Sequence, residues 1–354
     1  MAKITVLAPV FWQLTGTAYR YYGGVEPLIE GIMSEWVKQG HEVSCVCAHG
    51  SKSWDGVKVH TASQPLTPQI HTAKFEQALF QRYEQEILKS DVIWDNTHFM
   101  PSFVEKHLKK WDVPIYATWH HSPDNLQTMP PVDYEHFIAI SKWQQQALSN
   151  KFGVPFHHVY NPVRQDVYKN TELDGKGKHW LFLGRISTVK GVAMVPQLAR
   201  DFPDERFVIT GDTLFTNESL LAQNLLRQAD ELPNLKIHYN CNFDEKCEYL
   251  RTAKGLLHTS LWQEPYGLIL LEAFVYGKPV LAFARGASPE IIAHKKNGYL
   301  VEGRGASLEE EYALYKAGFM KFAGMSWNSK NIRKIDKRFH NDFAAKEYLR
   351  CFGI

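Results

Sequence analysis

The 354 residues, 44% hydrophobic and 22% charged, suffice for two globular domains, and 40 basic against 38 acidic residues indicate no polyanionic partner by net charge. No run reaches the about 18 consecutive apolar residues of a membrane-spanning helix, and residues 1–9 lack the pattern of a signal peptide. The five cysteines, without zinc spacing, are expected to be buried free thiols, such as Cys45 and Cys47, which favours a reducing cytoplasm.

Strand and helix patterns alternate along the first half of the chain. Short apolar runs predict strands at 4–7, 42–47, 57–60, 91–94, 115–118, 137–140 and 158–160. Helical periodicity predicts helices at 25–38, 73–88 and 142–150. The polar stretch 169–178, rich in glycine and lysine, is the best candidate for a linker.

The second half repeats this alternation. Strands are predicted at 180–183, 207–210, 236–239, 255–258, 280–284 and 299–301. A helical pattern over 342–352 ends the chain. Repeated alternation of strands and helices predicts an α/β protein with two open, mostly parallel sheets and helices on both faces. Ligands of such sheets bind at the carboxyl ends of the strands.

Two cations follow the predicted strand 180–183. Gly184 and Arg185 come directly after it, and Lys190 precedes the next helix. A guanidinium can clamp a diphosphate through paired hydrogen bonds, and an ammonium adds a point charge. The alternative is that both are ordinary loop charges.

Segment 262–272 sets two carboxylates eight residues apart around a turn that opens an apolar helix. Glu272 lies inside this helix, where an unpaired carboxylate would cost several kcal/mol, so we expect it to have a partner. Glu264 lies before the helix, beside the free backbone N–H groups near Gly267 that suit an anion. A buried ion pair is the structural alternative for Glu272.

With these two segments the chain resembles the retaining GT-B glycosyltransferases of family 4, the glycosyl transferases of group 1. Matching segments follow in order almost from end to end: 22–26, 117–120, 137–141, 160–163, 277–280, 286–290 and 297–301. The chain departs from the pattern at Pro162, where the family usually has glycine, and after Val301.

The resemblance implies two Rossmann-like domains that face a cleft. Residues 1–168 would form the acceptor side and 169–339 the donor side. The last helix, at about 340–354, would pack back on the first domain.

The resemblance also implies roles for single residues. His120 would contact the transferred sugar, with His98 and His121 as weaker candidates. Glu264 would hold sugar hydroxyls, Glu272 those of the nucleotide ribose, and Arg185 with Lys190 the diphosphate. Further donor-binding residues would be Gly184, Cys241, Tyr266, Gly267 and Leu268.

A long aromatic loop leaves the carboxyl end of the first predicted strand and should border the same cleft. Trp12 and Tyr21 could stack on the acceptor, because aromatic faces pack well on sugar rings. Gly16, Gly23 and Gly24 could let the backbone approach a phosphate or a sugar. Packing of the aromatics within their own domain is the alternative.

The resemblance implies a nucleotide-diphosphate sugar as co-substrate, of the UDP-glucose or GDP-mannose type, and no other cofactor. The sequence contains no Asp-x-Asp, so transfer without a metal ion is expected. A nucleotide-sugar isomerase and a non-catalytic sugar-nucleotide binding subunit are alternatives. The acceptor stays open among a glycan, a lipid-linked sugar, a small molecule and a nucleic acid.

Near the end, a basic run has helical spacing and is expected to be a solvated face. Contact with an anionic membrane surface or a nucleic acid is the alternative. The run comprises Lys330, Arg333, Lys334, Lys337 and Arg338.

Overall fold

The computed structural model describes residues 1–15, 24–67, 70–98, 100, 102, 111–123, 136–168, 177–213, 218–305 and 307–354. The chain divides into two compact units. Unit 1 comprises Met1–Val167 together with Asp336–Ile354, and unit 2 comprises Tyr168–Ile335.

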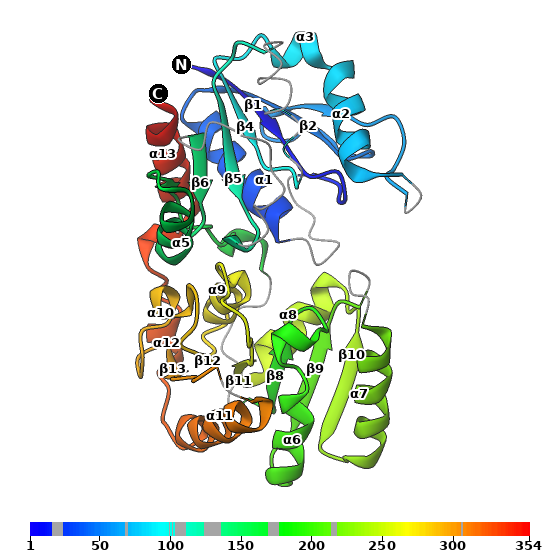
Figure 1. The fold of residues 1–354 in the computed structure, drawn as a ribbon, viewed down its shortest axis with the longest axis vertical. Helices are drawn as coiled ribbons and strands as arrows, with labels where there is room; N and C mark the ends of the chain where they lie inside the picture. Colours follow the sequence, from blue (N-terminus) through cyan, green and yellow to red (C-terminus); the bar gives the residue numbers. More distant parts are fainter. Residues whose placement is uncertain are drawn as a thin grey trace. The chain divides into compact units, whose positions relative to one another are not determined.

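Unit 1 is built on a parallel seven-stranded sheet of order β3-β2-β1-β4-β5-β6-β7 (Figure 1). Its strands are β1 (Lys3–Leu7), β2 (Glu42–Cys47), β3 (Lys58–Thr61), β4 (Val92–Asp95), β5 (Ile115–Trp119), β6 (Phe137–Ala139) and β7 (His157–His158). The strand order runs outward in both directions from β1 and β4, so this sheet has a switch point between those strands.

Helices of unit 1 include one from the far end of the chain. They are α1 (Val25–Lys38), α2 (Thr72–Arg82), α3 (Glu84–Ile87), α5 (Lys142–Phe152) and α13 (Asn341–Phe352). Trp36 of α1 donates from Nε1 to the carbonyl of Ala345 at 2.9 Å and packs edge-on against Trp94 and Tyr348. This aromatic cluster explains why α13, red in Figure 1, joins the N-terminal strands.

Unit 2 has a parallel six-stranded sheet of order β10-β9-β8-β11-β12-β13. Its strands are β8 (His179–Leu183), β9 (Phe207–Gly211), β10 (Leu235–Tyr239), β11 (Ala253–His258), β12 (Val280–Phe283) and β13 (Gly298–Val301). Its helices are α6 (Met194–Asp201), α7 (Ser219–Glu231), α8 (Phe243–Thr252), α9 (Leu268–Val275), α10 (Ser288–Ile291), α11 (Leu308–Ala323) and α12 (Ser329–Ile332).

Each predicted strand has a counterpart, but one predicted helix is not continuous. The predicted helix 73–88 is two helices that meet at Tyr83, whose hydroxyl donates to the carbonyl of Thr61 on β3. The basic run, expected to be a solvated face, spans two short elements: α12 ends at Ile332, and a separate 3₁₀ turn spans Lys337–Phe339. Lys330, Lys334 and Lys337 are exposed, whereas Arg333 and Arg338 are half-buried. The Asp336 side chain accepts from the Arg338 N–H and starts that turn.

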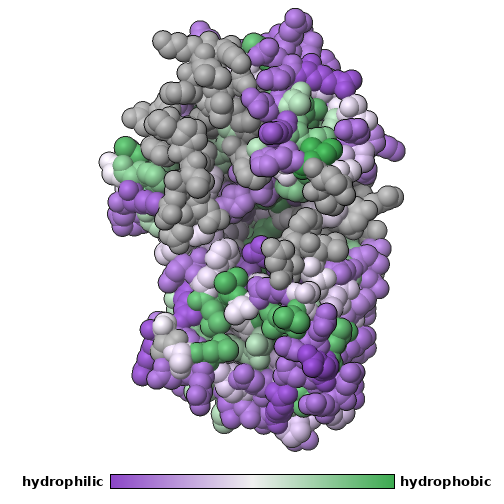
Figure 2. Space-filling view, turned by 45° about the vertical axis from the view of Figure 1, so that its right-hand side comes forward, coloured by the Kyte–Doolittle hydropathy of each residue, from purple (hydrophilic) through white to green (hydrophobic). Residues whose placement is uncertain are grey.

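On the face shown in Figure 2, green apolar patches lie among purple hydrophilic residues. Leu220 and Met320 are among the exposed large hydrophobic residues. Single exposed apolar side chains are normal for globular domains. Across the described ranges, no helix is both long and apolar enough to cross a membrane.

Glu26 in the first turn of α1 should make stability depend on pH. Burial and then the charge of Glu30 raise its pKa from 4.5 to about 7, against the backbone N–H groups of Glu26 and Val25. The folded chain therefore keeps a proton that the unfolded chain has released. This contribution is fully present below pH 4.5 and is lost as the pH rises to about 7. It amounts to at most about 3 kcal/mol.

Glu26→Gln is expected to flatten this pH dependence, because the amide does not titrate. Urea denaturation at pH 5 and pH 7.5 measures the difference in unfolding free energy for each variant. Glu35→Gln, on the same helix, is the matched control and should keep the wild-type slope. An unchanged slope in Glu26→Gln would show that Glu26 does not carry the effect.

Candidate active site

The predicted donor residues of unit 2 gather where β8 and β11 end. These strands are parallel neighbours, so the segments that follow them meet at one edge of the sheet. The turn after β8 contains Lys190 in a 3₁₀ helix (Thr188–Lys190). Thr259, in the segment after β11, donates from Oγ1 to the Lys190 carbonyl at 2.7 Å and so joins the two segments.

Glu264 is buried in this edge and held through one of its two oxygens. Lys190 Nζ donates to Oε2, and so does Trp262 Nε1 at 2.9 Å. Ser260 Oγ lies 3.3 Å and His258 Nε2 3.6 Å from the same Oε2. Within the described chain, the other oxygen, Oε1, has no hydrogen-bond partner. The oxygen Oε2 is thus fixed by the protein, and Oε1 can accept a hydrogen bond from a ligand.

The charges around Glu264 keep it ionised. Burial alone would raise its pKa, but the Lys190 ammonium and the hydrogen bond from His258 hold the pKa well below the ordinary value of 4.5. The Lys190 ammonium also lies 4.8 Å from the centre of the Trp262 ring. Glu264 therefore remains a hydrogen-bond acceptor throughout the physiological pH range.

The segment after β12 fixes the loop that carries Glu264. Arg285 Nη1 donates to the Leu261 carbonyl at 2.9 Å, and the Ala287 N–H donates to the Glu264 carbonyl at 2.9 Å. Gly286 lies between them at a φ of +55°, and a Cβ there would lie 2.1 Å from the Glu264 carbonyl oxygen. Only glycine permits this close approach.

Arg185 is exposed directly after β8 and Gly184. No described residue forms a hydrogen bond or an ion pair with its side chain. Gly267, at a φ of +90°, is the N-cap of α9 and has no side chain that could cap the helix. The guanidinium and the first N–H groups of α9 are both suited to bind an anion.

The remaining predicted donor residues lie in the same unit. Tyr266 is buried just before α9, and Leu268 is the first residue of that helix. Cys241 is buried after β10 and accepts a hydrogen bond from Thr210 Oγ1 at 3.0 Å. The roles predicted for these residues stay predictions.

Glu272 lies on α9 in a buried ion pair, the structural alternative that the sequence analysis left open, but its partner was not predicted. Lys246 Nζ of α8 lies 3.0 and 3.2 Å from its two carboxylate oxygens, and the Tyr168 hydroxyl donates to Oε1 at 2.8 Å. The expected partner of Glu272 is thus Lys246. No local motif marks it, because it is 26 residues away and meets Glu272 only through helix packing.

In unit 1, His120 follows β5 at the carboxyl edge of the sheet. Its Nε2 lies 3.0 Å from Asn96 Oδ1, and Asn96 follows β4, the neighbouring strand. The His98 and His121 rings pack edge to face with centres 4.9 Å apart. The structure thus gathers the three predicted histidines at one edge, together with Asn96, which sequence reasoning missed.

The predicted acceptor loop is only partly described. Trp12 is half-buried, and Gly24 is the N-cap of α1. Gly16, Tyr21 and Gly23 lie outside the described residues. The acceptor role of the loop stays a prediction.

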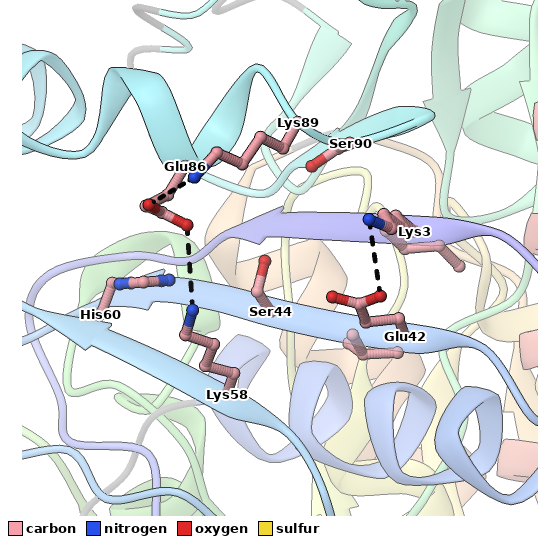
Figure 3. A pocket seen from close by; sticks show the side chains of 10 residues that line it. Lys3, Glu42, Ser44, Lys58, His60, Glu86, Lys89 and Ser90 are labelled. Carbon is pink, nitrogen blue, oxygen red and sulfur yellow. Dashed lines mark hydrogen bonds and ion pairs between the residues drawn. The ribbon is translucent and has the colours of Figure 1, made fainter.

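A small cavity of unit 1 lies away from these residues (Figure 3). Lys3, Glu42 and Lys58 line it, and they are the first residues of β1, β2 and β3. It is therefore at the amino ends of the strands, opposite the edge that carries His120. Two of its lysines, Lys58 and Lys89, point toward Glu86 in Figure 3 and pair with it at 3.8 and 2.8 Å.

Two family models match consecutive parts of the chain. The model described as Glycosyltransferase Family 4 matches residues 22–167, and the one described as Glycosyl transferases group 1 matches residues 163–312. The two matches cover most of both units.

The sequence identity to individual relatives is low. An uncharacterized glycosyltransferase of Methanocaldococcus jannaschii is 24% identical over 305 residues, which cover 80% of this chain and 82% of that protein. Spore coat protein SA of Bacillus subtilis is 30% identical over 148 residues, but the match spans only 39% of this chain and 38% of that protein. The crystal structure of Anabaena HepE in complex with UDP and glucose superposes with a TM-score of 0.73 at 19% identity, covering 100% of both chains.

Proposed function

Because this chain belongs to the family 4 glycosyltransferases and has the GT-B fold, we propose that it moves a hexosyl group from a nucleotide-diphosphate sugar to an acceptor hydroxyl. We propose further that the donor is of the UDP-glucose or GDP-mannose type. The transfer would retain the configuration of the sugar and need no metal ion.

The half-held carboxylate of Glu264 is the observation that carries this proposal. Lys190, Trp262 and their neighbours fix Oε2, while Oε1 has no partner among the described residues. An ionised carboxylate with one open oxygen can accept hydrogen bonds from sugar hydroxyls. Its fixed position would orient the sugar ring for transfer.

The diphosphate would lie against Arg185 and the amino end of α9. The exposed guanidinium has no competing partner among the described residues, and the first N–H groups of α9 add positive potential. Lys190 would contribute as well, although its ammonium already holds Glu264. As the bond between sugar and diphosphate breaks, these groups would stabilise the growing negative charge.

Retention would need no protein nucleophile in this proposal. The acceptor hydroxyl would attack from the face that the diphosphate leaves, and a phosphate oxygen would take its proton. His120 of unit 1 would contact the transferred sugar, and Trp12 in the loop after β1 would contact the acceptor. The protein would supply positioning and electrostatic stabilisation.

The donor preference has one line of support from the comparisons. A further crystal structure of HepE, in complex with UDP-glucose, superposes with a TM-score of 0.70 and covers 100% of both chains. We therefore rank UDP-glucose first. The cytoplasm remains the proposed location, in keeping with five cysteines that are all free thiols.

A thermal-shift screen over UDP-, GDP- and ADP-sugars tests the proposal. A donor at a hundred times its dissociation constant should add about 2.7 kcal/mol to the unfolding free energy. Donor hydrolysis by the same preparation then separates an enzyme from a binding subunit. If no nucleotide sugar shifts the melting temperature or is hydrolysed, the proposal fails.

Transfer should survive metal chelation. The sequence has no Asp-x-Asp, and Arg185 can supply positive charge at the diphosphate in place of a cation. The transfer rate in excess EDTA is expected to stay within about threefold of the untreated rate, because charge stabilisation comes from the protein. Complete loss that manganese or magnesium restores would contradict this part of the proposal.

A further inference from the structure

One buried amide side chain contacts His120, and a second one fixes the backbone beside it. Asn96 is 1% exposed and presents Oδ1 to His120 Nε2 at 3.0 Å. An amide oxygen can only accept, so this contact requires a proton on Nε2. An acceptor at this place favours the tautomer with its proton on Nε2.

Gln144 of α5 fixes the backbone on both sides of His120. Its Nε2 donates to the Trp119 carbonyl at 3.1 Å and to the His121 carbonyl at 2.7 Å. Its Oε1 accepts from the Ile140 N–H at 2.8 Å. Two of these three bonds hold the carbonyls of the residues that flank His120, and the third ties the buried Gln144 amide to the segment after β6.

The surroundings of His120 keep the ring neutral. Burial first, and then the nearby His121 and His98, lower the pKa of His120 to about 3. A neutral ring with its proton on Nε2 has a lone pair on Nδ1 and can accept a hydrogen bond there. Among the described residues, Nδ1 has no partner.

Asn96 also keeps one polar atom without a partner. Its Nδ2 is buried, and no described residue accepts from it. A purely structural amide would be expected to satisfy both of its ends. The contact with His120 gives a reason to keep an amide at this position.

From these contacts we propose that Asn96 is a positioning residue that holds His120 as the neutral Nε2–H tautomer, so that Nδ1 accepts a hydrogen bond from a substrate hydroxyl. The identity of that hydroxyl, on the transferred sugar, rests on the proposed function. The tautomer and its dependence on Asn96 do not, so the two can fail separately.

Nitrogen-15 NMR of the full-length labelled protein measures the tautomer directly. The His120 signals are identified by their loss in His120→Gln. We expect a protonated Nε2 and an unprotonated Nδ1 throughout pH 5–8. An Nδ1–H tautomer, or an imidazolium within that range, would overturn the proposal.

Asn96→Asp and Asn96→Ala then test the dependence on Asn96. The aspartate still accepts from Nε2 but adds a negative charge, which should raise the His120 pKa by about one unit or more. The other titratable groups that act on this ring, His98 and His121, are unchanged in that variant. In Asn96→Ala, His120 should lose its single tautomer, and turnover should fall about tenfold or more through lost orientation.

Thr97→Val is the matched control for destabilisation of the same loop. The Thr97 hydroxyl donates to Asp95 and accepts from the Met100 N–H, and it forms no hydrogen bond with His120. This variant should lower the melting temperature while the His120 tautomer and pKa stay as in the wild type. If Asn96→Ala likewise leaves both unchanged, Asn96 does not position His120. A protein inactive toward every donor would refute the proposed function, while the NMR result would still decide the tautomer.

Discussion

Replacing Arg185 with alanine is expected to lower turnover by about two orders of magnitude, or about 3 kcal/mol of transition-state stabilisation. The guanidinium lies exposed after β8 with no partner among the described residues, so its loss should leave the fold intact. The diphosphate gains charge as the sugar leaves. The effect should therefore be larger on kcat than on donor affinity.

Steady-state kinetics with varied donor concentration separate these two effects. Arg185→Lys should recover part of the turnover, because an ammonium supplies charge without the paired hydrogen bonds. Arg200→Ala is the matched control: Arg200 is an exposed arginine of α6, whose Nη2 bonds Gln228. Its kinetics should equal those of the wild type. If Arg185→Ala kept a third of the turnover, Arg185 would have no major part in stabilising the leaving group.

Much of the fold was predictable from sequence because parallel strands buried on both faces are continuous apolar runs. The strand His179–Leu183 is buried along its whole length and was predicted to within one residue. The break at Tyr83 was not predictable, because hydrophobic periodicity continues across it and the hydroxyl contacts a distant strand. The turn within the basic run was likewise not predictable, because the helical spacing of its charges does not indicate that Asp336 caps a separate 3₁₀ turn.

The candidate site was predictable where its functional residues lie within one short segment of the sequence. Glu264 and Arg185 could be found because each lies within a few residues of an element with a clear pattern. The pairing of Lys190 with Glu264 spans 74 residues and depends on β8 and β11 being neighbours. Asn96 had no sequence signal either, since its importance comes from the position of β4 beside β5.

Breaking the buried pair of Lys246 and Glu272 should have the largest effect on stability. Lys246→Met leaves the Glu272 carboxylate buried, with the Tyr168 hydroxyl as its one remaining donor among the described residues. Removing one partner of a buried ion pair typically costs about 3–5 kcal/mol, because the other charge stays without compensation. Urea denaturation followed by circular dichroism measures the loss. A loss below about 1 kcal/mol would mean that the pair is as weak as an exposed one.

The double variant Lys246→Met, Glu272→Gln separates the structural role of Glu272 from its proposed role at the ribose. Removing both charges should restore most of the stability, because neither charge is then left unpaired. If Glu272 binds the ribose, the restored protein should still bind the donor more weakly than the wild type, since a neutral amide accepts weaker hydrogen bonds than a carboxylate. Donor titration beside the denaturation curves distinguishes the outcomes. Wild-type stability together with wild-type donor affinity would show that Glu272 serves only the ion pair, and the ribose assignment would then be wrong.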